Sequence, residues 1–166
     1  MNITLRPLHL EDKAVIAKLA DNVNIWSSVR DYFPHPYTQR DAEWFIEHSL
    51  AMKVQENFAI TYNENFCGII SANVQTDVYR KSAEMGYWIG EPFWGKGIAT
   101  KATDLICDYT FQNLGVERIF SSVFEYNKAS IRVLEKSGFE KEGVFRKAIF
   151  KKGRLWDEHK FAKLRA

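Results

Sequence analysis

The sequence is poor in the features that mark several classes of protein. It has only two cysteines in 166 residues. Cys67 lies in an apolar strand-like run and Cys107 in a helix-like one, so two buried thiols are expected rather than a disulfide or redox pair. The 23 basic and 21 acidic residues leave a formal charge of +2, too small to indicate nucleic acid as a direct partner. No metal-binding pattern is visible.

Long apolar runs are missing too. No segment reaches the length of a signal peptide or of a membrane span, so we expect a cytoplasmic protein without a membrane partner. Linkers, repeats and low-complexity stretches are also absent. A chain of 166 residues fits one domain, residues 1–166, which can bury a core without disulfides or metals.

Hydrophobic periodicity predicts alternating strands and helices. Thr38 and Asn127 are placed to cap two of the helices, with Asp41 completing a capping box after Thr38. This order predicts an α+β fold with a mixed, mostly antiparallel sheet flanked by helices. Strands are expected at 3–6, 57–62, 66–74, 118–124, 145–150 and 155–164 and in a segment ending at 89; helices are expected to begin near 10, 38, 98 and 127.

The most informative segment covers residues 87–100, which read as a strand, a tight glycine turn and the start of a helix. Gly95 and Gly97 have no side chains, so a ligand can approach their main chain closely. The first amides of the following helix have no partners within the helix, and the helix dipole places positive charge at that end. The junction therefore predicts a phosphate site.

Two kinds of phosphate loop have glycines near these positions. A Walker A loop requires Ser or Thr directly after its Gly-Lys pair, but Gly97 follows Lys96. Bulky residues at 92–94 also fill the stretch that would have to wrap the phosphates. These departures disfavour a nucleotide hydrolase.

Gly97, Ile98 and Ala99 fit the second half of the pyrophosphate loop of the GNAT N-acetyltransferase superfamily; Trp94 stands where that family usually has Gln or Arg. The wider sequence resembles the branch that contains the ribosomal-protein N-terminal acetyltransferases RimJ and RimL. The resemblance implies the GNAT fold, with a central splayed pair of strands, and acetyl-CoA as cosubstrate. It covers nearly the whole chain and is carried by residues 30–38, 84–100, 127–130, 135–140 and 142–143.

The same resemblance assigns cofactor contacts. The main chain of the strand end is expected to pair with pantetheine, because a bulge at Gly86 should separate this strand from its neighbour. The amides of the glycine loop should hold the pyrophosphate. Lys96 and Lys136 should reach the outer phosphates, although a solvated lysine is the alternative for each. The expected cofactor-binding set is Trp88, Ile89, Gly95, Lys96, Gly97, Ile98, Ala99, Thr100, Asn127 and Lys136.

Acetyl transfer from a thioester to an amine needs a base for the amine, support for the oxyanion and a proton for the thiolate. Glu84 is the candidate base, acting through water; a surface carboxylate paired with a nearby Lys or Arg is the alternative. Asn127 is a candidate catalytic residue and also a helix cap. Ser130 is the candidate proton donor, and an ordinary serine in the first turn is its alternative.

Arg30, Tyr32, Phe33 and Tyr37 belong to a segment rich in aromatics and proline. It is expected to form the acceptor side of the cleft, with simple packing as the alternative. Five basic residues between 146 and 154 are expected to form a solvated sheet edge, or else to meet an acidic protein or ribosomal RNA.

The function favoured by the resemblance is transfer of an acetyl group to a primary amine, preferably a protein N-terminal α-amine. Direct attack in a ternary complex is expected, because neither cysteine lies where the resemblance would place a covalent nucleophile. Two alternatives stay open: acetylation of a small amine such as an amino acid, polyamine or antibiotic, and coenzyme A binding without catalysis. A homodimer is also compatible with the sequence.

Overall fold

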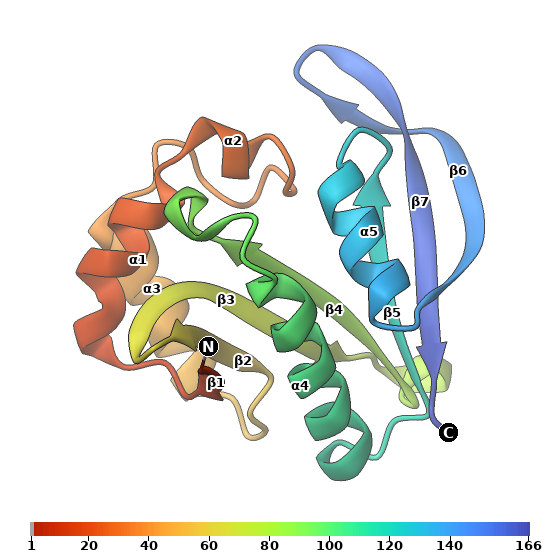
Figure 1. Ribbon diagram of the computed structural model, residues 1–166, viewed down its shortest axis with the longest axis horizontal. Coiled ribbons are helices and arrows are strands. Elements are labelled where there is room, and N and C mark those ends of the chain that lie inside the picture. Colours follow the sequence, from red (N-terminus) through yellow and green to blue (C-terminus); the bar gives the residue numbers. More distant parts are fainter. Residues whose placement is uncertain (1) are drawn as a thin grey trace.

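A computed structural model describes residues 2–166, which form one seven-stranded sheet with helices on both faces (Figure 1). The strand order is β1-β2-β3-β4-β5-β7-β6, and every neighbouring pair is antiparallel except β4 and β5. The strands are β1 (Ile3–Arg6), β2 (Asn57–Tyr62), β3 (Asn65–Val74), β4 (Ser82–Ile89), β5 (Arg118–Phe124), β6 (Glu140–Lys151) and β7 (Arg154–Leu164). The helices are α1 (Lys13–Ala20), α2 (Val23–Trp26), α3 (Gln39–Leu50), α4 (Ile98–Asn113) and α5 (Lys128–Lys136), with 3₁₀ turns at Leu10–Asp12, Asp77–Tyr79 and Glu91–Phe93.

The helix caps follow from local sequence. The Thr38 hydroxyl accepts a hydrogen bond from the Asp41 amide at 3.3 Å, and the Asp41 carboxylate accepts one from the Thr38 amide at 2.7 Å, which confirms the predicted capping box. The Asn127 side chain likewise caps α5, as predicted. Helix α2 was not predicted, because four residues are too short to show periodicity; its cap is Asn22.

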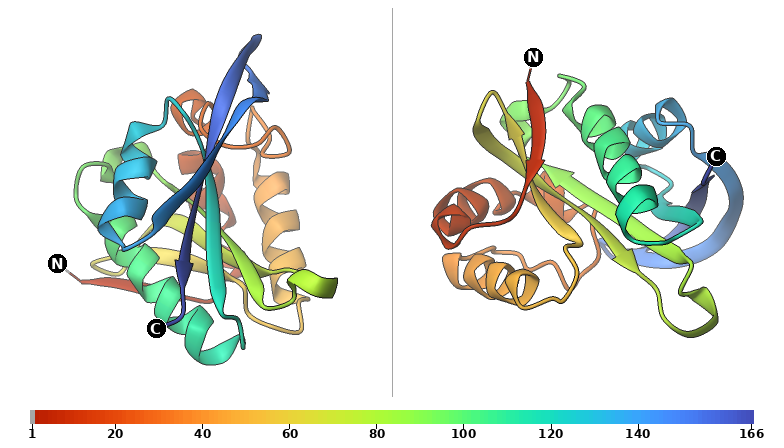
Figure 2. Two further views of the ribbon diagram at one scale, coloured as in Figure 1. Left: turned by 90° about the vertical axis from the view of Figure 1, so that its right-hand side faces the viewer. Right: turned by 90° about the horizontal axis from the view of Figure 1, so that it is seen from below.

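Two cores lie on opposite faces of the sheet. Helix α4 packs on one face, while α1 and α3 pack on the other (Figure 2). Side chains alternate along β4, so Met85 and Ile89 enter the α4 core and Trp88 enters the α1 and α3 core. By the same alternation, Glu84 lies on the α1 and α3 face and Tyr87 on the α4 face.

Strands β4 and β5 pair only at their start, between Ser82–Glu84 and Arg118–Phe120. Beyond that point each strand stays with its outer neighbour: β4 remains paired with β3 up to Ile89, and β5 with β7 up to Phe124. The two halves of the sheet therefore diverge, which confirms the predicted splayed pair (Figure 1). The register between β3 and β4 is unbroken at Gly86, so the predicted bulge was wrong and the divergence comes from β4 and β5 following different partners.

Candidate active site

An open cleft of about 1460 Å³ lies where β4 and β5 separate. Pockets for one small ligand are commonly about 300–1,000 Å³, so this cleft has room for two substrates. It brings together every residue predicted for the site. The predicted residues that border it are Arg30, Tyr32, Phe33, Tyr37, Glu84, Trp88, Ile89, Gly95, Lys96, Gly97, Ile98, Ala99, Thr100, Asn127, Ser130 and Lys136.

The glycine turn connects the end of β4 with the start of α4. Gly95 and Gly97 have φ values of 73° and 72°, in the left-handed region that disfavours other residues. A Cβ atom added at either glycine would meet no atom within 4 Å, so the main chain borders open space. Within residues 2–166, none of the amides from Gly95 to Thr100 donates a backbone hydrogen bond; the first that does is Lys101, to the Gly97 carbonyl. Such a row of unpaired amides at a helix start fits a pyrophosphate.

The two predicted phosphate lysines differ in their surroundings. The Lys96 ammonium lies 5.7 Å from the ring centroids of both Tyr62 and Phe93, which border the turn. Lys136 is exposed at the end of α5. Their contact with phosphates stays a prediction.

Trp94, which stands where the resemblance would place Gln or Arg, contacts the end of β4. Its Nε1 donates a hydrogen bond to the Ile89 carbonyl at 2.7 Å and so ties the turn to the strand end. The Gly90 amide donates to a β3 carbonyl at 2.8 Å, and the Trp88 carbonyl lies against Gly68 of β3. The N–H and C=O groups of successive residues in a strand point alternately to its two sides. Those of Trp88 point toward β3 and belong to the β3–β4 ladder, so those of Ile89 point away from β3, into the opening.

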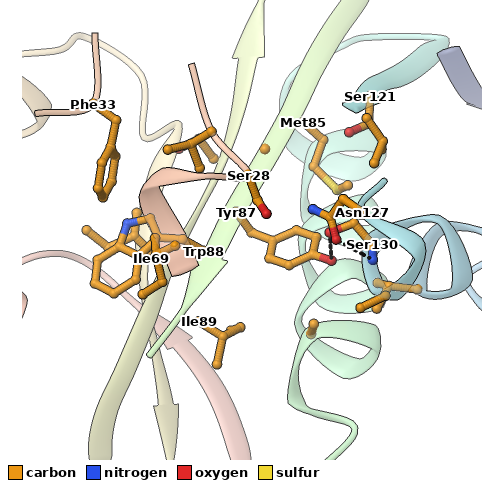
Figure 3. A pocket seen from close by; sticks show the side chains of 18 of the residues that line it. Ser28, Phe33, Ile69, Met85, Tyr87, Trp88, Ile89, Ser121, Asn127 and Ser130 are labelled. Carbon is orange, nitrogen blue, oxygen red and sulfur yellow. Dashed lines mark hydrogen bonds between the residues drawn. The ribbon is translucent and has the colours of Figure 1, made fainter. Parts of the chain in front are cut away.

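Three polar side chains converge on the α4 face of the opening (Figure 3). The hydroxyls of Tyr87 and Ser130 share a hydrogen bond at 2.9 Å, and the Ser130 amide donates to Asn127 Oδ1 at 3.2 Å. Burial raises the pKa of Tyr87 to about 12, although its hydrogen bond to Ser130 acts in the opposite direction. The phenol therefore keeps its proton at neutral pH and can act as a hydrogen-bond donor.

Sequence reasoning missed Tyr87. The available signal was its position between Met85 and Ile89, where strand alternation places a side chain on the same face as the glycine turn. A tyrosine at that position brings a hydroxyl into a largely apolar face, but its partner Ser130 is 43 residues away and could not be inferred from spacing.

Glu84 lies on the other face and is ion-paired with Arg30. Its side chain is 25% exposed. Burial lowers the pKa of Arg30, but the charge and hydrogen bond of Glu84 outweigh burial, so the pKa is raised overall. Gly86, the next residue on this face, presents no side chain. The cleft thus has a carboxylate beside an open surface, with a guanidinium that belongs to the predicted acceptor segment.

The other predicted acceptor residues separate into two groups. The Phe33 ring packs against Trp88 at 6.2 Å and against Tyr37 at 4.9 Å between centroids. Tyr37 is 8% exposed, and burial raises its pKa to about 12. Tyr32, by contrast, is 83% exposed. Phe33 and Tyr37 therefore shape the wall by packing, and Arg30 is the residue that reaches the carboxylate.

Neither cysteine is suited to covalent catalysis. Both are free thiols and buried, and burial raises the pKa of each to about 12. Within residues 2–166, no group of three or more His, Cys, Asp or Glu side chains is placed to hold a metal ion. No helix in the described part of the chain is long and apolar enough to cross a membrane.

Comparison with known proteins identifies the family. The family profile described as "Acetyltransferase (GNAT) domain" matches residues 2–140. The chain belongs to the GNAT acetyltransferase family. Its fold is the one predicted from the resemblance, and the protein is an N-acetyltransferase that uses acetyl-CoA.

Three proteins show what this chain is similar to. The uncharacterized N-acetyltransferase p20 of Bacillus licheniformis is 34% identical over 98% of this chain and 93% of its own length. A spermidine N-acetyltransferase from Vibrio cholerae, solved with CoA and spermine, has a TM-score of 0.83 and 26% identity, covering 98% of this chain and 95% of its own. RimL, a ribosomal L7/L12 alpha-N-protein acetyltransferase solved with coenzyme A, has a TM-score of 0.86 and 20% identity, covering 99% and 94%.

Proposed function

We propose that this acetyltransferase acetylates the α-amine of a protein N-terminus by direct attack in a ternary complex. The main support is the opening between β4 and β5, which connects two faces of one sheet that carry different polar groups. The glycine turn and the Tyr87–Ser130 pair lie on the α4 face, where acetyl-CoA would bind. Glu84 lies on the opposite face, from which the acceptor would enter.

Each face supplies one half of the proton transfer. Glu84 accepts the proton of the incoming ammonium through a water, which leaves the amine lone pair free to attack the thioester carbonyl carbon. As the carbon–sulfur bond breaks, the hydroxyl of the Tyr87–Ser130 pair that faces the sulfur gives its proton to the thiolate and takes up the second proton that the attacking nitrogen loses, so coenzyme A leaves as the free thiol. Asn127 holds the first turn of α5, and with it Ser130, in place. Arg30 must share Glu84 with the acceptor, so acceptor binding competes with this ion pair.

The surface next to Glu84 favours a peptide. It continues over Gly86 and past Ser71 and Asn73 of β3, which lie opposite Gly86 and Glu84 in the strand register. A Cβ atom at Gly86 would meet nothing within 4 Å, so an extended chain can lie close to the strand. The hydroxyl and amide groups here suit the backbone amides of a peptide.

Helix α3 forms the far wall of this surface. The rings of Trp44 and His48 are stacked, with centroids 5.2 Å apart, and both border the cleft. The acidic residue on the same wall, Asp41, already accepts two hydrogen bonds from Thr38. A polyamine would need carboxylates spaced to match its ammonium groups, and Asp41 is the single carboxylate among the α3 residues that border the cleft.

Release of free thiol from acetyl-CoA with panels of acceptors tests the proposal. We expect at least one N-terminal peptide to give a kcat/KM about tenfold or more above those of spermidine, amino acids and aminoglycosides. Preference for spermidine would overturn the peptide assignment and leave the acetyltransferase activity intact. The absence of turnover with every amine would favour the coenzyme A sensor.

Variants at the two faces test the mechanism. Glu84→Gln and Ser130→Ala should each lower kcat, by about 100-fold for Glu84→Gln, and leave the Kd for acetyl-CoA within twofold. Glu47→Gln on the exposed side of α3 is a matched control that should keep full turnover. Unchanged turnover in Glu84→Gln would show that the base lies elsewhere.

A further inference from the structure

One of the five basic residues at 146–154 departs from the solvated edge expected from the sequence, whereas the other four are exposed. Lys151 is only 3% exposed. Its Nζ lies 2.7 Å from Asp31 Oδ1 and 3.7 Å from the ring centroid of Trp26. A lysine is rarely buried unless its charge is paired, and here an ion pair and a cation–π contact together hold the ammonium.

Further contacts join the same two regions. The Trp156 indole donates a hydrogen bond to the Lys151 carbonyl at 3.0 Å. The Tyr126 ring meets Trp156 edge-on at 4.7 Å, and the Tyr126 hydroxyl donates to the Ser27 carbonyl. We define the hairpin latch as Trp26, Asp31, Tyr126, Lys151 and Trp156. It connects α2 and the segment after it with β6, β7 and the loop that follows β5, and the hairpin tip bends toward the side of α2 (Figure 1).

The latch lies where the sheet is split. Strands β4 and β5 no longer pair beyond Glu84, and the latch is one of the contacts that join the two halves of the sheet past that point. The segment at residues 28–37 contains no helix or strand, yet it forms the acceptor wall of the cleft through Arg30 and Phe33. Other anchors of this segment are the Arg30–Glu84 ion pair, the Tyr37 amide, which donates to Asp21 at 3.0 Å, and the packing of Phe33 against Trp88 and Tyr37. His35 Nδ1 also lies 3.6 Å from Asp21 Oδ1.

We propose that Lys151 is a positioning residue that holds the segment at residues 28–37 in place and thereby preforms the acceptor site. Lys151, Asp31 and Trp26 lie outside the glycine turn and the starts of α4 and α5, so their contacts act on the acceptor segment and leave acetyl-CoA binding unaffected. Any amine that enters past Arg30 meets this wall. The inference therefore needs an acceptor for its kinetic test but does not depend on whether that acceptor is a peptide.

The test compares Lys151→Met with Lys151→Arg. Methionine keeps the apolar cover over Trp26 and removes the charge, whereas arginine keeps both the ion pair and the cation–π contact. We expect Lys151→Met to raise the KM for the acceptor about tenfold, in line with loss of one charged hydrogen bond, with kcat and the Kd for acetyl-CoA within twofold. Lys151→Arg should restore the wild-type KM. Lys147→Met, an exposed lysine of the same hairpin, is the matched control.

Two further measurements keep the inference falsifiable if Lys151→Met folds poorly or if no acceptor is found. Asp31 is 72% exposed in its side chain, so Asp31→Asn should fold normally, raise the acceptor KM, and show no added effect in the double variant with Lys151→Met. Hydrogen exchange should become faster at residues 27–37 and stay unchanged in α4. Equal losses of acceptor and acetyl-CoA binding, or unchanged exchange at 27–37, would overturn the positioning role.

Discussion

Replacing Gly97 with valine tests the amide cradle most directly. Gly97 has a φ of 72° and caps α4, so a β-branched residue there is strained by about 1–2 kcal/mol. Because an added Cβ meets no protein atom within 4 Å, the fold should tolerate the substitution apart from this strain. In a chain of this length the strain corresponds to a fall in Tm of roughly 2–8 °C.

The effect on binding should be much larger than the effect on stability. The new side chain projects into the open space beside the amides, where the pyrophosphate would lie. Displacing the ligand from two amide hydrogen bonds to a charged oxygen costs about 3–6 kcal/mol, which is more than a 100-fold increase in the Kd for acetyl-CoA. Isothermal titration of the purified protein with acetyl-CoA measures this change.

Gly153 provides a matched control for backbone strain. It has a φ of 70° in the β6–β7 turn, and an added Cβ would also meet nothing within 4 Å. Gly153→Val should therefore lower the Tm by a similar amount and leave acetyl-CoA binding unchanged. If Gly97→Val bound acetyl-CoA with wild-type affinity, the cradle assignment would be refuted; if both variants lost affinity equally, strain would explain the loss.

Two other predictions concern single side chains. Tyr87→Phe removes one hydroxyl from the Tyr87–Ser130 pair and should lower kcat about tenfold in steady-state assays, with the Kd for acetyl-CoA unchanged; an unaltered kcat would remove Tyr87 from the mechanism. Burial acts to raise the pKa of Asp12, but hydrogen bonds from Arg6 and the His9 amide outweigh burial and lower the pKa overall. The ionised Asp12 therefore stabilises the fold above the unfolded-state pKa of about 3.9, and this stabilisation is lost as the pH falls through the folded-state pKa. Asp12→Asn should therefore lose about 2 kcal/mol of unfolding free energy at pH 7 by denaturant titration, with a difference from wild type that shrinks below pH 4; a difference independent of pH would contradict this.

The features that could be predicted from sequence depend on neighbouring residues. The row of unpaired amides at residues 95–100 could be predicted because two glycines and a helix start are sufficient to expose it. The caps at Thr38 and Asn127 needed only the three residues that follow each. Strand β6 shows where such reasoning weakens: it begins at Glu140, five residues before the predicted start, because its exposed first half alternates too little to be distinguished from a loop.

Taken alone, the sequence predicted the order of most elements through short-range patterns of glycine, polarity and helix start signals, and its resemblance to the GNAT superfamily indicated the family and the cosubstrate. Only the tertiary structure decided which side chains act together. Tyr87 meets Ser130, Arg30 meets Glu84, and Lys151 meets Asp31 across separations of 43, 54 and 120 residues. These pairs depend on strand register and on how the two halves of the split sheet are placed relative to one another. Neither can be inferred from the spacing of residues along the chain.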